Sequence, residues 1–186
     1  MVSFQGKADA ERFLAELRER LARFGLALHQ DKTRLIEFGR YAGERRKARG
    51  LGKPETFAFL GFTHACGKTR QGWFQVQRLT MRKRLRAKLK EVKAELSRRR
   101  HESTPQVGLW LGSVVRGHFQ YYAVPLNYRS IASFRDEVLR HWKRWFSNRS
   151  QRGSISWEHL RRHASLCLPP ARVLHPYPAQ RFAVRT

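Results

Sequence analysis

Apolar residues recur at helical spacing in the first part of the chain and again after residue 79. The first such stretch predicts a helix from about Ala10 to Phe24, with Asp9 as its N-terminal cap. Gly25 follows it and is expected to end the helix in a left-handed conformation. The apolar positions that define this helix are Phe13, Leu14, Leu17, Leu21 and Phe24.

Short apolar segments with turn residues between them predict strands in the next part of the chain. Residues 26–28 and 33–38 are interpreted as two short strands, and residues 39–54, rich in Gly, Arg and Lys, as a loop. Residues 57–62 are predicted as a buried strand, with residues 72–76 as its hairpin partner. About three antiparallel strands are therefore expected to accompany the first helix.

From Leu79 onward the periodicity is helical. A second helix carries one apolar stripe on a strongly cationic surface. A third helix is expected to begin at Thr104, as cap, with Pro105 in its first turn, and a fourth spans about residues 130–146. Short loops join these three helices, which favours a compact bundle. A short helix over residues 156–163 and a proline-rich extended tail complete the prediction.

The net charge identifies the class of partner. The chain has 186 residues with 39 Lys and Arg against 14 Asp and Glu, a formal charge of +25, yet 41% of its residues are hydrophobic. A chain of this composition folds and needs an anionic partner to relieve its self-repulsion. The charge is +5 over residues 1–50, +10 over residues 51–104 and +10 over residues 105–186. Nucleic acid is the favoured partner.

The predicted helices after residue 79 supply the candidate RNA-binding residues. Cations on the second helix far outnumber Glu91 and Glu95, so the helix is expected to lie along phosphates. On the third helix Tyr121 lies off the apolar face and is the candidate for stacking on a base, whereas Trp110 and Phe119 have core spacing. The candidates are Arg82, Lys83, Arg84, Arg86, Lys88, Lys90, Arg98, Arg99, Arg100, Arg116, His118, Tyr121, Arg140, Lys143, Arg144 and Arg149.

The residues show no catalytic or metal-binding constellation. His159 and His163 are four apart but have no third ligand nearby, and Asp136 and Glu137 are adjacent, so they point about 100° apart on a helix. Two cysteines 101 positions apart indicate neither a disulfide framework nor a zinc site. No run of about 18 apolar residues and no signal peptide is found, so we expect a cytoplasmic protein that does not span a membrane.

The order of several motifs resembles the C-terminal part of group II intron reverse transcriptases, also called maturases. Residues 8–38 resemble a palm segment of that family, and Phe59 to Phe62 resembles its next conserved Phe-Leu-Gly-Phe block. Later motifs resemble the maturase-specific domain, domain X or thumb, and the family's C-terminal tail. These are Gly117 to Tyr122, Asn127, Trp142, Arg149 to Gln151, Trp157, Leu168 to Pro170, His175 to Pro178, Arg181 and Phe182.

The resemblance implies an α+β fold in three parts. Residues 1–77 would be a remnant of the palm, with one helix and about three antiparallel strands. Residues 78–150 would be the three-helix thumb, and residues 151–186 a short helix and an extended basic arm. Lys32 matches a palm-loop lysine that lies near the leaving phosphate in the family. The palm remnant would expose a sheet edge, which favours marginal stability or association.

The family's catalytic Tyr-x-Asp-Asp strand, whose aspartates hold Mg²⁺, has no counterpart in this sequence. We therefore expect no catalytic residue and no cofactor for this chain alone, and no polymerase activity without a partner. The resemblance implies binding of structured intron RNA, with target DNA as a further partner, to assist splicing or mobility. The alternatives are the C-terminal half of a split RNA-directed DNA polymerase, active only with an N-terminal half, and a nonfunctional relic of a mobile element.

Overall fold

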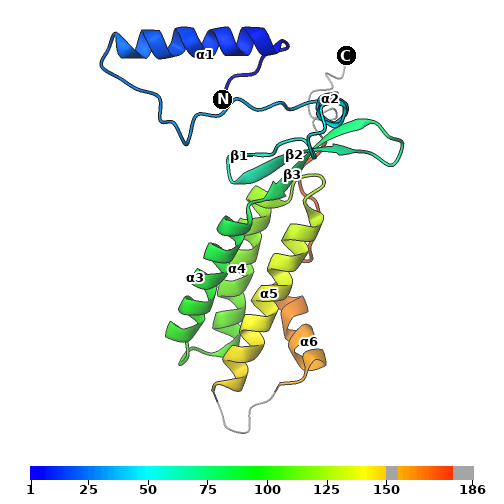
Figure 1. Ribbon diagram of the computed structural model, residues 1–186. Coiled ribbons are helices and arrows are strands. Elements are labelled where there is room, and N and C mark those ends of the chain that lie inside the picture. The colour runs from blue at the N-terminus through cyan, green and yellow to red at the C-terminus, as the bar shows by residue number, and fades with distance from the viewer. Residues whose placement is uncertain (150–154, 178–186) are drawn as a thin grey trace, which may run out of the picture. The chain divides into compact units, whose positions relative to one another are not determined.

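The computed structural model describes residues 1–149 and 155–177, and it has an α+β fold (Figure 1). The described residues form six helices and one antiparallel sheet of three strands, so the predicted fold class is confirmed. The chain divides into two compact units, Met1–Glu55 and Thr56–Thr186. The sequence placed a boundary after residue 77, whereas the structure groups all three strands with the helices that follow them.

The first unit contains helices α1 (Lys7–Ala22) and α2 (Ala42–Ala48). Helix α1 begins three residues before the predicted start, and no side chain caps it, so the capping role expected of Asp9 is wrong. Gly25 does adopt the predicted left-handed conformation, with φ of +68°, and the amide of Leu26 donates to the carbonyl of Leu21. This pattern satisfies carbonyls that the helix end leaves unpaired.

The strands predicted over residues 26–28 and 33–38 are wrong. A strand requires a neighbour with which to share its ladder hydrogen bonds. Neither segment belongs to the sheet, and between them the amides of Lys32 and Thr33 donate to the carbonyl of His29 in a tight turn. The loop predicted over residues 39–54 is also partly wrong, because α2 lies within it; Gly50, two residues after the helix ends at Ala48, has φ of +68°.

The sheet of the second unit has the order β1 (Phe57–Phe59), β2 (Phe62–Lys68) and β3 (Phe74–Thr80). The single strand predicted over residues 57–62 is wrong, because the chain reverses at Leu60 and Gly61, which have φ of +46° and +77°. Positive φ at both central residues is typical of the two-residue hairpin turn that matches strand twist. The strand expected over residues 72–76 is β3, and it pairs with β2.

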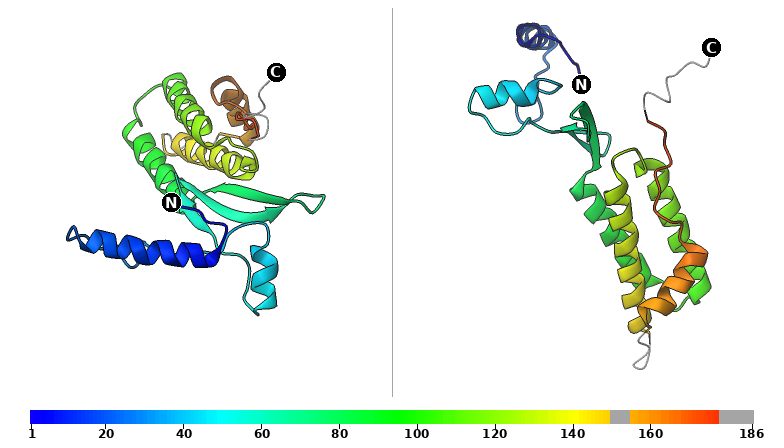
Figure 2. Two further views of the ribbon diagram at one scale, coloured as in Figure 1. Left: turned by 90° about the horizontal axis from the view of Figure 1, so that it is seen from above. Right: turned by 90° about the vertical axis from the view of Figure 1, so that its right-hand side faces the viewer.

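Three long helices follow the sheet and form the bundle that the periodicity predicted: α3 (Arg82–Arg98), α4 (Thr104–Tyr122) and α5 (Tyr128–Ser147). Figure 1 and the right-hand view of Figure 2 show the sheet at one end of these helices. Ser103, one residue before the predicted cap, caps α4 in a capping box with Gln106. The largest buried side chains of the bundle are Trp142, Phe134, Leu111, Ile131 and Leu160.

Helix α6 (Trp157–Cys167) packs against α4 and α5 and extends four residues beyond its predicted end. The segment after it is extended, as predicted, but it is held against the bundle. The amides of Leu174 and His175 both donate to the carbonyl of Ala123, and the Arg135 guanidinium donates to the carbonyl of Pro169. The rest of the predicted arm, residues 178–186, lies outside the described residues.

Candidate nucleic-acid interface

The sheet and the first half of α3 come from a stretch of chain without any acidic residue. From Thr56 to Lys90 there is no Asp or Glu, and the same stretch carries nine Lys and Arg residues. Helix α3 begins only two residues after β3 ends. This stretch therefore presents positive charge that its own sequence cannot neutralise, which is the pattern a polyanion requires.

Helix α3 has two differently charged sides. Its apolar stripe, with Val92 and Leu96 buried, faces the core. At about 100° per residue, Glu91 and Glu95 fall on one side of this stripe. On that side Lys88 pairs with Glu91, and both Arg98 and Arg99 pair with Glu95. The charges on this side of the helix are therefore largely balanced.

The opposite side of α3 carries cations alone. Five exposed residues share it, and among the residues the structure describes none of them has an ion-pair partner. They are Arg82, Lys83, Arg86, Lys90 and Lys93. We call this set the acid-free side of α3. Four of the five were predicted to bind RNA; Lys93 was not among the predicted residues, although its position on the helical wheel places it there.

Electrostatic interactions with α4 and α5 show which neighbouring helix each side of α3 faces. Lys88 lowers the pKa of His118 on α4, and Arg84 lies close enough to Tyr122 on α4 to act on its pKa. Both cations therefore belong to the side that faces α4. Lys93 instead acts on His141 of α5. The acid-free side thus borders α5, which packs against α3.

His141 and Arg144 continue the positive charge onto α5. Burial lowers the pKa of His141, and the neighbouring charges of Arg144 and Lys93 lower it further against the opposing effect of Glu137. The predicted residue Arg144 therefore acts on the same ring as Lys93 of the acid-free side. Arg140, also predicted, forms an ion pair with Glu137 and is partly neutralised.

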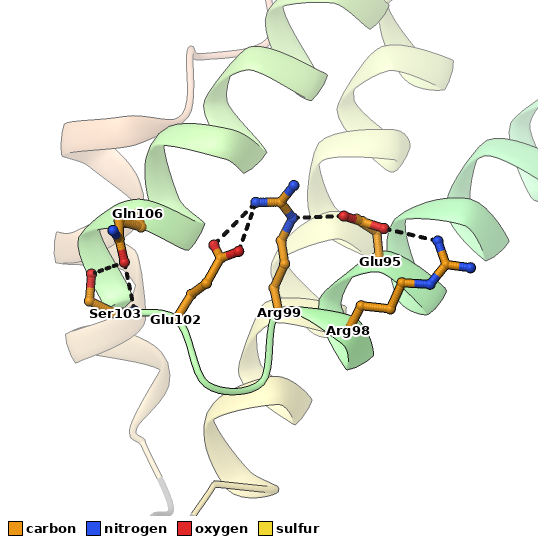
Figure 3. A network of polar contacts seen from close by, with 6 residues as sticks. All are labelled: Glu95, Arg98, Arg99, Glu102, Ser103 and Gln106. Atoms are coloured by element: carbon orange, nitrogen blue, oxygen red, sulfur yellow. Dashed lines mark hydrogen bonds and ion pairs between the residues drawn. The ribbon is translucent and has the colours of Figure 1, made fainter.

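Arg99 belongs to an ion-pair network at the turn between α3 and α4 (Figure 3). Its guanidinium donates to Glu95 at 2.9 Å and to both carboxylate oxygens of Glu102 at 3.1 Å. The same guanidinium lies 4.8 Å from the centre of the Trp110 ring. Arg98 joins the network through Glu95. These contacts neutralise Arg99 within the chain and give it a structural role, whereas the sequence predicted that it binds RNA.

The other predicted cations have different surroundings. Lys143 lies over the Trp157 ring at 5.1 Å, and Arg149 over the Trp145 ring at 4.4 Å, so both are engaged by indole rings on or near α5 and α6. Arg116 is exposed on α4, and its guanidinium lies near Gly112, where α6 packs. Arg100 is exposed beyond the end of α3. Lys32 is exposed at the turn of the first unit.

His118 is buried, so the prediction that it contacts RNA is wrong. It is 8% exposed and stacks on Phe134 with ring centroids 3.7 Å apart. Burial, with a smaller contribution from Lys88, lowers its pKa to about 4, so the ring is neutral at pH 7. Its position on the apolar face of α4 was the signal in the sequence for a core residue.

Tyr121 is half exposed, as its position off the apolar face suggested. Its ring stacks on Phe62 with centroids 5.7 Å apart, and its hydroxyl donates to the carbonyl of Leu60 at 2.7 Å. One face of the ring therefore packs against the sheet, while half of the residue's surface remains accessible. Sequence reasoning did not anticipate that Tyr121 joins α4 to the β1–β2 turn.

Metal chemistry finds no support in the described parts of the chain. No three His, Cys, Asp or Glu side chains come together there as a metal site. The rings of His159 and His163 lie 4.9 Å apart at a tilt, and no third ligand from residues 1–149 or 155–177 joins them. Nor is any helix in residues 1–149 and 155–177 long and apolar enough to cross a membrane.

No family model matches the chain, and no curated protein is significantly similar to it.

Proposed function

We propose that the chain binds structured RNA through the acid-free side of α3, together with Arg144 of α5. The observation that carries the proposal is the segregation of charge on α3. Lys and Arg residues on an ordinary solvated helix are interspersed with acids that neutralise them, and here the acids are confined to the side facing α4. A side without acids is stabilised by an external anion.

The geometry of the acid-free side suits a phosphate backbone. Arg82 and Lys93 are eleven residues apart, so the five cations extend over about 16 Å of helix. A cation that contacts a phosphate releases a condensed counterion, which favours binding strongly at low salt. The major groove of A-form RNA is too deep and narrow for side chains to read. The helix would therefore contact the backbone and recognise shape instead of base sequence.

The choice of RNA follows from the resemblance to group II intron reverse transcriptases and maturases. By that resemblance the chain would be a C-terminal, RNA-binding part of such a protein, which assists splicing or mobility of its intron, with target DNA as a further partner. The test is the salt dependence of binding between the full chain and a transcribed group II intron. The wild-type affinity should fall steeply with salt.

Replacement of Arg82, Lys83, Arg86 and Lys90 by Gln should weaken binding and flatten the salt dependence, by about one unit of slope for each phosphate that the variant no longer neutralises. An unchanged slope would exclude this side of α3 as the interface. If the wild type binds the intron no more tightly than an unrelated RNA duplex, this result would favour the alternative of a nonfunctional relic, whose charge has no current use.

A second candidate function rests on the burial of the first unit. In Met1–Glu55 only Ala10 and Ala42 are buried, and many large apolar side chains are exposed. A unit with so little buried surface is stabilised by a partner. This favours the C-terminal half of a split RNA-directed DNA polymerase, which would require an N-terminal half that carries the Tyr-x-Asp-Asp strand. A reading frame directly upstream that ends in that strand would support it; primer extension by this chain alone would contradict it.

A further inference from the structure

A row of aromatic rings extends across one face of the sheet. Strand register places Phe59 opposite Phe62 and Phe57 opposite His64, so these four side chains share a face. The Phe57 and His64 rings stack in parallel, with centroids 4.7 Å apart and planes within 3°. Phe59 lies 6.4 Å from the same His64 ring and is 42% exposed.

The row continues from the sheet onto α4. Phe62 is buried between Tyr121, which stacks on it at 5.7 Å, and Tyr122, which meets it edge-on at 5.2 Å. The hydrogen bond from the Tyr121 hydroxyl to the carbonyl of Leu60 fixes the ring beside the β1–β2 turn. We call the set Phe57, Phe59, Phe62, His64 and Tyr121 the aromatic strip. Its most accessible rings are Phe59, which is opposite Phe62 in the register, and Tyr121, which stacks on Phe62.

Cations without acids flank the aromatic strip. Arg78 of β3 is opposite His64 in the register of β2 and β3, and Arg84 lies near Tyr122 at the other end. Burial and the charge of Arg78 lower the pKa of His64, against a smaller opposing effect of its backbone hydrogen bond to Phe62, so the ring is neutral at pH 7 and stacks as an uncharged aromatic. All residues of the strip except Tyr121 belong to the acid-free stretch Thr56–Lys90, and Tyr121 stacks on Phe62 of that stretch.

We propose that the aromatic strip binds the bases of single-stranded RNA, which stack on Phe59 and Tyr121 while Arg78 and Arg84 hold the backbone. Bases stack on aromatic rings regardless of sequence, and flanking cations bind the phosphates between them. The inference rests on the proposed RNA binding, because the strip leads directly to α3. The amide of Met81, which precedes α3, donates to the carbonyl of Gly61 in the β1–β2 turn. A single strand on the strip would thus continue toward the backbone-binding helix.

The test measures binding of the full chain to two RNAs: a single-stranded ten-mer with one 2-aminopurine and a fully paired hairpin. Phe59→Leu and Tyr121→Leu keep an apolar side chain but remove the ring. Each should weaken binding of the ten-mer by between about 5-fold and 150-fold, as expected when one base has no ring to stack on, and leave the hairpin affinity and salt slope unchanged. Wild-type binding should also change the 2-aminopurine emission, because that emission reports stacking.

Matched variants separate this effect from a general loss of ring surface. Trp73→Leu removes a 61% exposed ring from the same acid-free stretch, but outside the strip, and should leave both affinities unchanged. Tyr121→Phe keeps the ring and should retain most of the affinity. Equal losses for Trp73→Leu, unchanged ten-mer affinity in both strip variants, or unaltered wild-type emission on binding would each overturn the inference. If the hairpin still binds in those cases, the proposed function stands; if neither RNA binds the wild type, both proposals fail.

Discussion

The side chain of Asn127 is hydrogen-bonded to Thr80, 47 residues earlier in the chain, and it joins the end of the sheet to the turn between α4 and α5. The Thr80 amide donates to Oδ1 of Asn127 at 3.0 Å, and Nδ2 of Asn127 donates to the Thr80 hydroxyl at 2.7 Å and to the carbonyl of Tyr122 at 2.8 Å. Asn127 is fully buried. One amide thereby fixes the position where β3 leads into α3.

Asn127→Ala should destabilise the protein strongly. It removes three hydrogen bonds and leaves the buried amide and hydroxyl of Thr80 without their Asn127 partner, while the Tyr122 carbonyl keeps only the Val124 amide, at a cost of about 3 kcal/mol. Thermal unfolding of the variant should show a midpoint lower by roughly 6–12 °C. Asn148→Ala, at an exposed Asn after α5, is the control and should change the midpoint little. Equal midpoints for the two variants would contradict this role of Asn127.

His118 should make the protein sensitive to acid. Its pKa is about 4 in the folded chain, below the ordinary value of 6.5, so the unfolded chain binds the proton more readily. The free energy of unfolding therefore has its full value above about pH 6.5. It decreases as the pH falls toward 4, by up to about 3 kcal/mol. The lowered pKa values of His64 and His141 act in the same direction.

The measurement is the free energy of unfolding in urea between pH 7.5 and pH 4.5. Replacement of His118 by Phe, which retains a ring to pack on Phe134, should reduce the loss of stability over this range. Replacement of the exposed His101 by Gln should leave that loss as in the wild type. If the His118 variant loses stability with acid as steeply as the wild type, the assignment to His118 is wrong.

Two glycines of α4 should respond in opposite ways to the same substitution. A Cβ at Gly112 would lie 2.4 Å from the carbonyl oxygen of Cys167, so Gly112→Ala must push α6 away from α4 and should cost roughly 1–3 kcal/mol. A Cβ at Gly117 meets nothing within 4 Å, so Gly117→Ala should stabilise α4 by up to about 1 kcal/mol. Urea unfolding checks both; a stabilising Gly112→Ala would contradict the close packing of α4 and α6.

Arg99→Gln should lower stability without changing RNA binding. The substitution removes the ion pairs with Glu95 and Glu102 and the contact with the Trp110 ring, which together stabilise the α3–α4 turn by about 1–2 kcal/mol. Because Arg99 is already neutralised, the salt slope of RNA binding should be unchanged. A slope reduced by a full unit would return Arg99 to the interface.

The helices were predictable because each carries its apolar residues on one face. The stripe of α3 and the core positions of α4 and α5 appear in the sequence at three- and four-residue spacing, and the structure buries them. His118 has the same core spacing on α4, and assigning it to RNA gave its polarity more weight than its position. The strands expected before residue 40 failed because local composition does not reveal whether a segment has a partner in a sheet.

The candidate site was predictable only in part. The cationic character of α3 is evident from composition, but its sidedness depends on where Glu91 and Glu95 fall on the helical wheel. The aromatic strip required the reversal at Leu60 and Gly61, since a continuous strand over residues 57–62 would place Phe59 and Phe62 on opposite faces. A single two-residue turn therefore decides which rings lie together.

The central claim, that RNA binds the acid-free side of α3, is tested most directly by comparing two double variants. Arg86→Gln with Lys90→Gln and Arg98→Gln with Lys88→Gln remove the same residue types from different sides of one helix; Lys88 and Arg98 are the cations paired with Glu91 and Glu95. All four side chains are exposed, so both variants should remain folded and carry equal net charge. The measurement is the slope of affinity for structured RNA against salt. We expect a slope reduced by about two units in the first variant and by less than half a unit in the second; equal slopes in the two would contradict the claim.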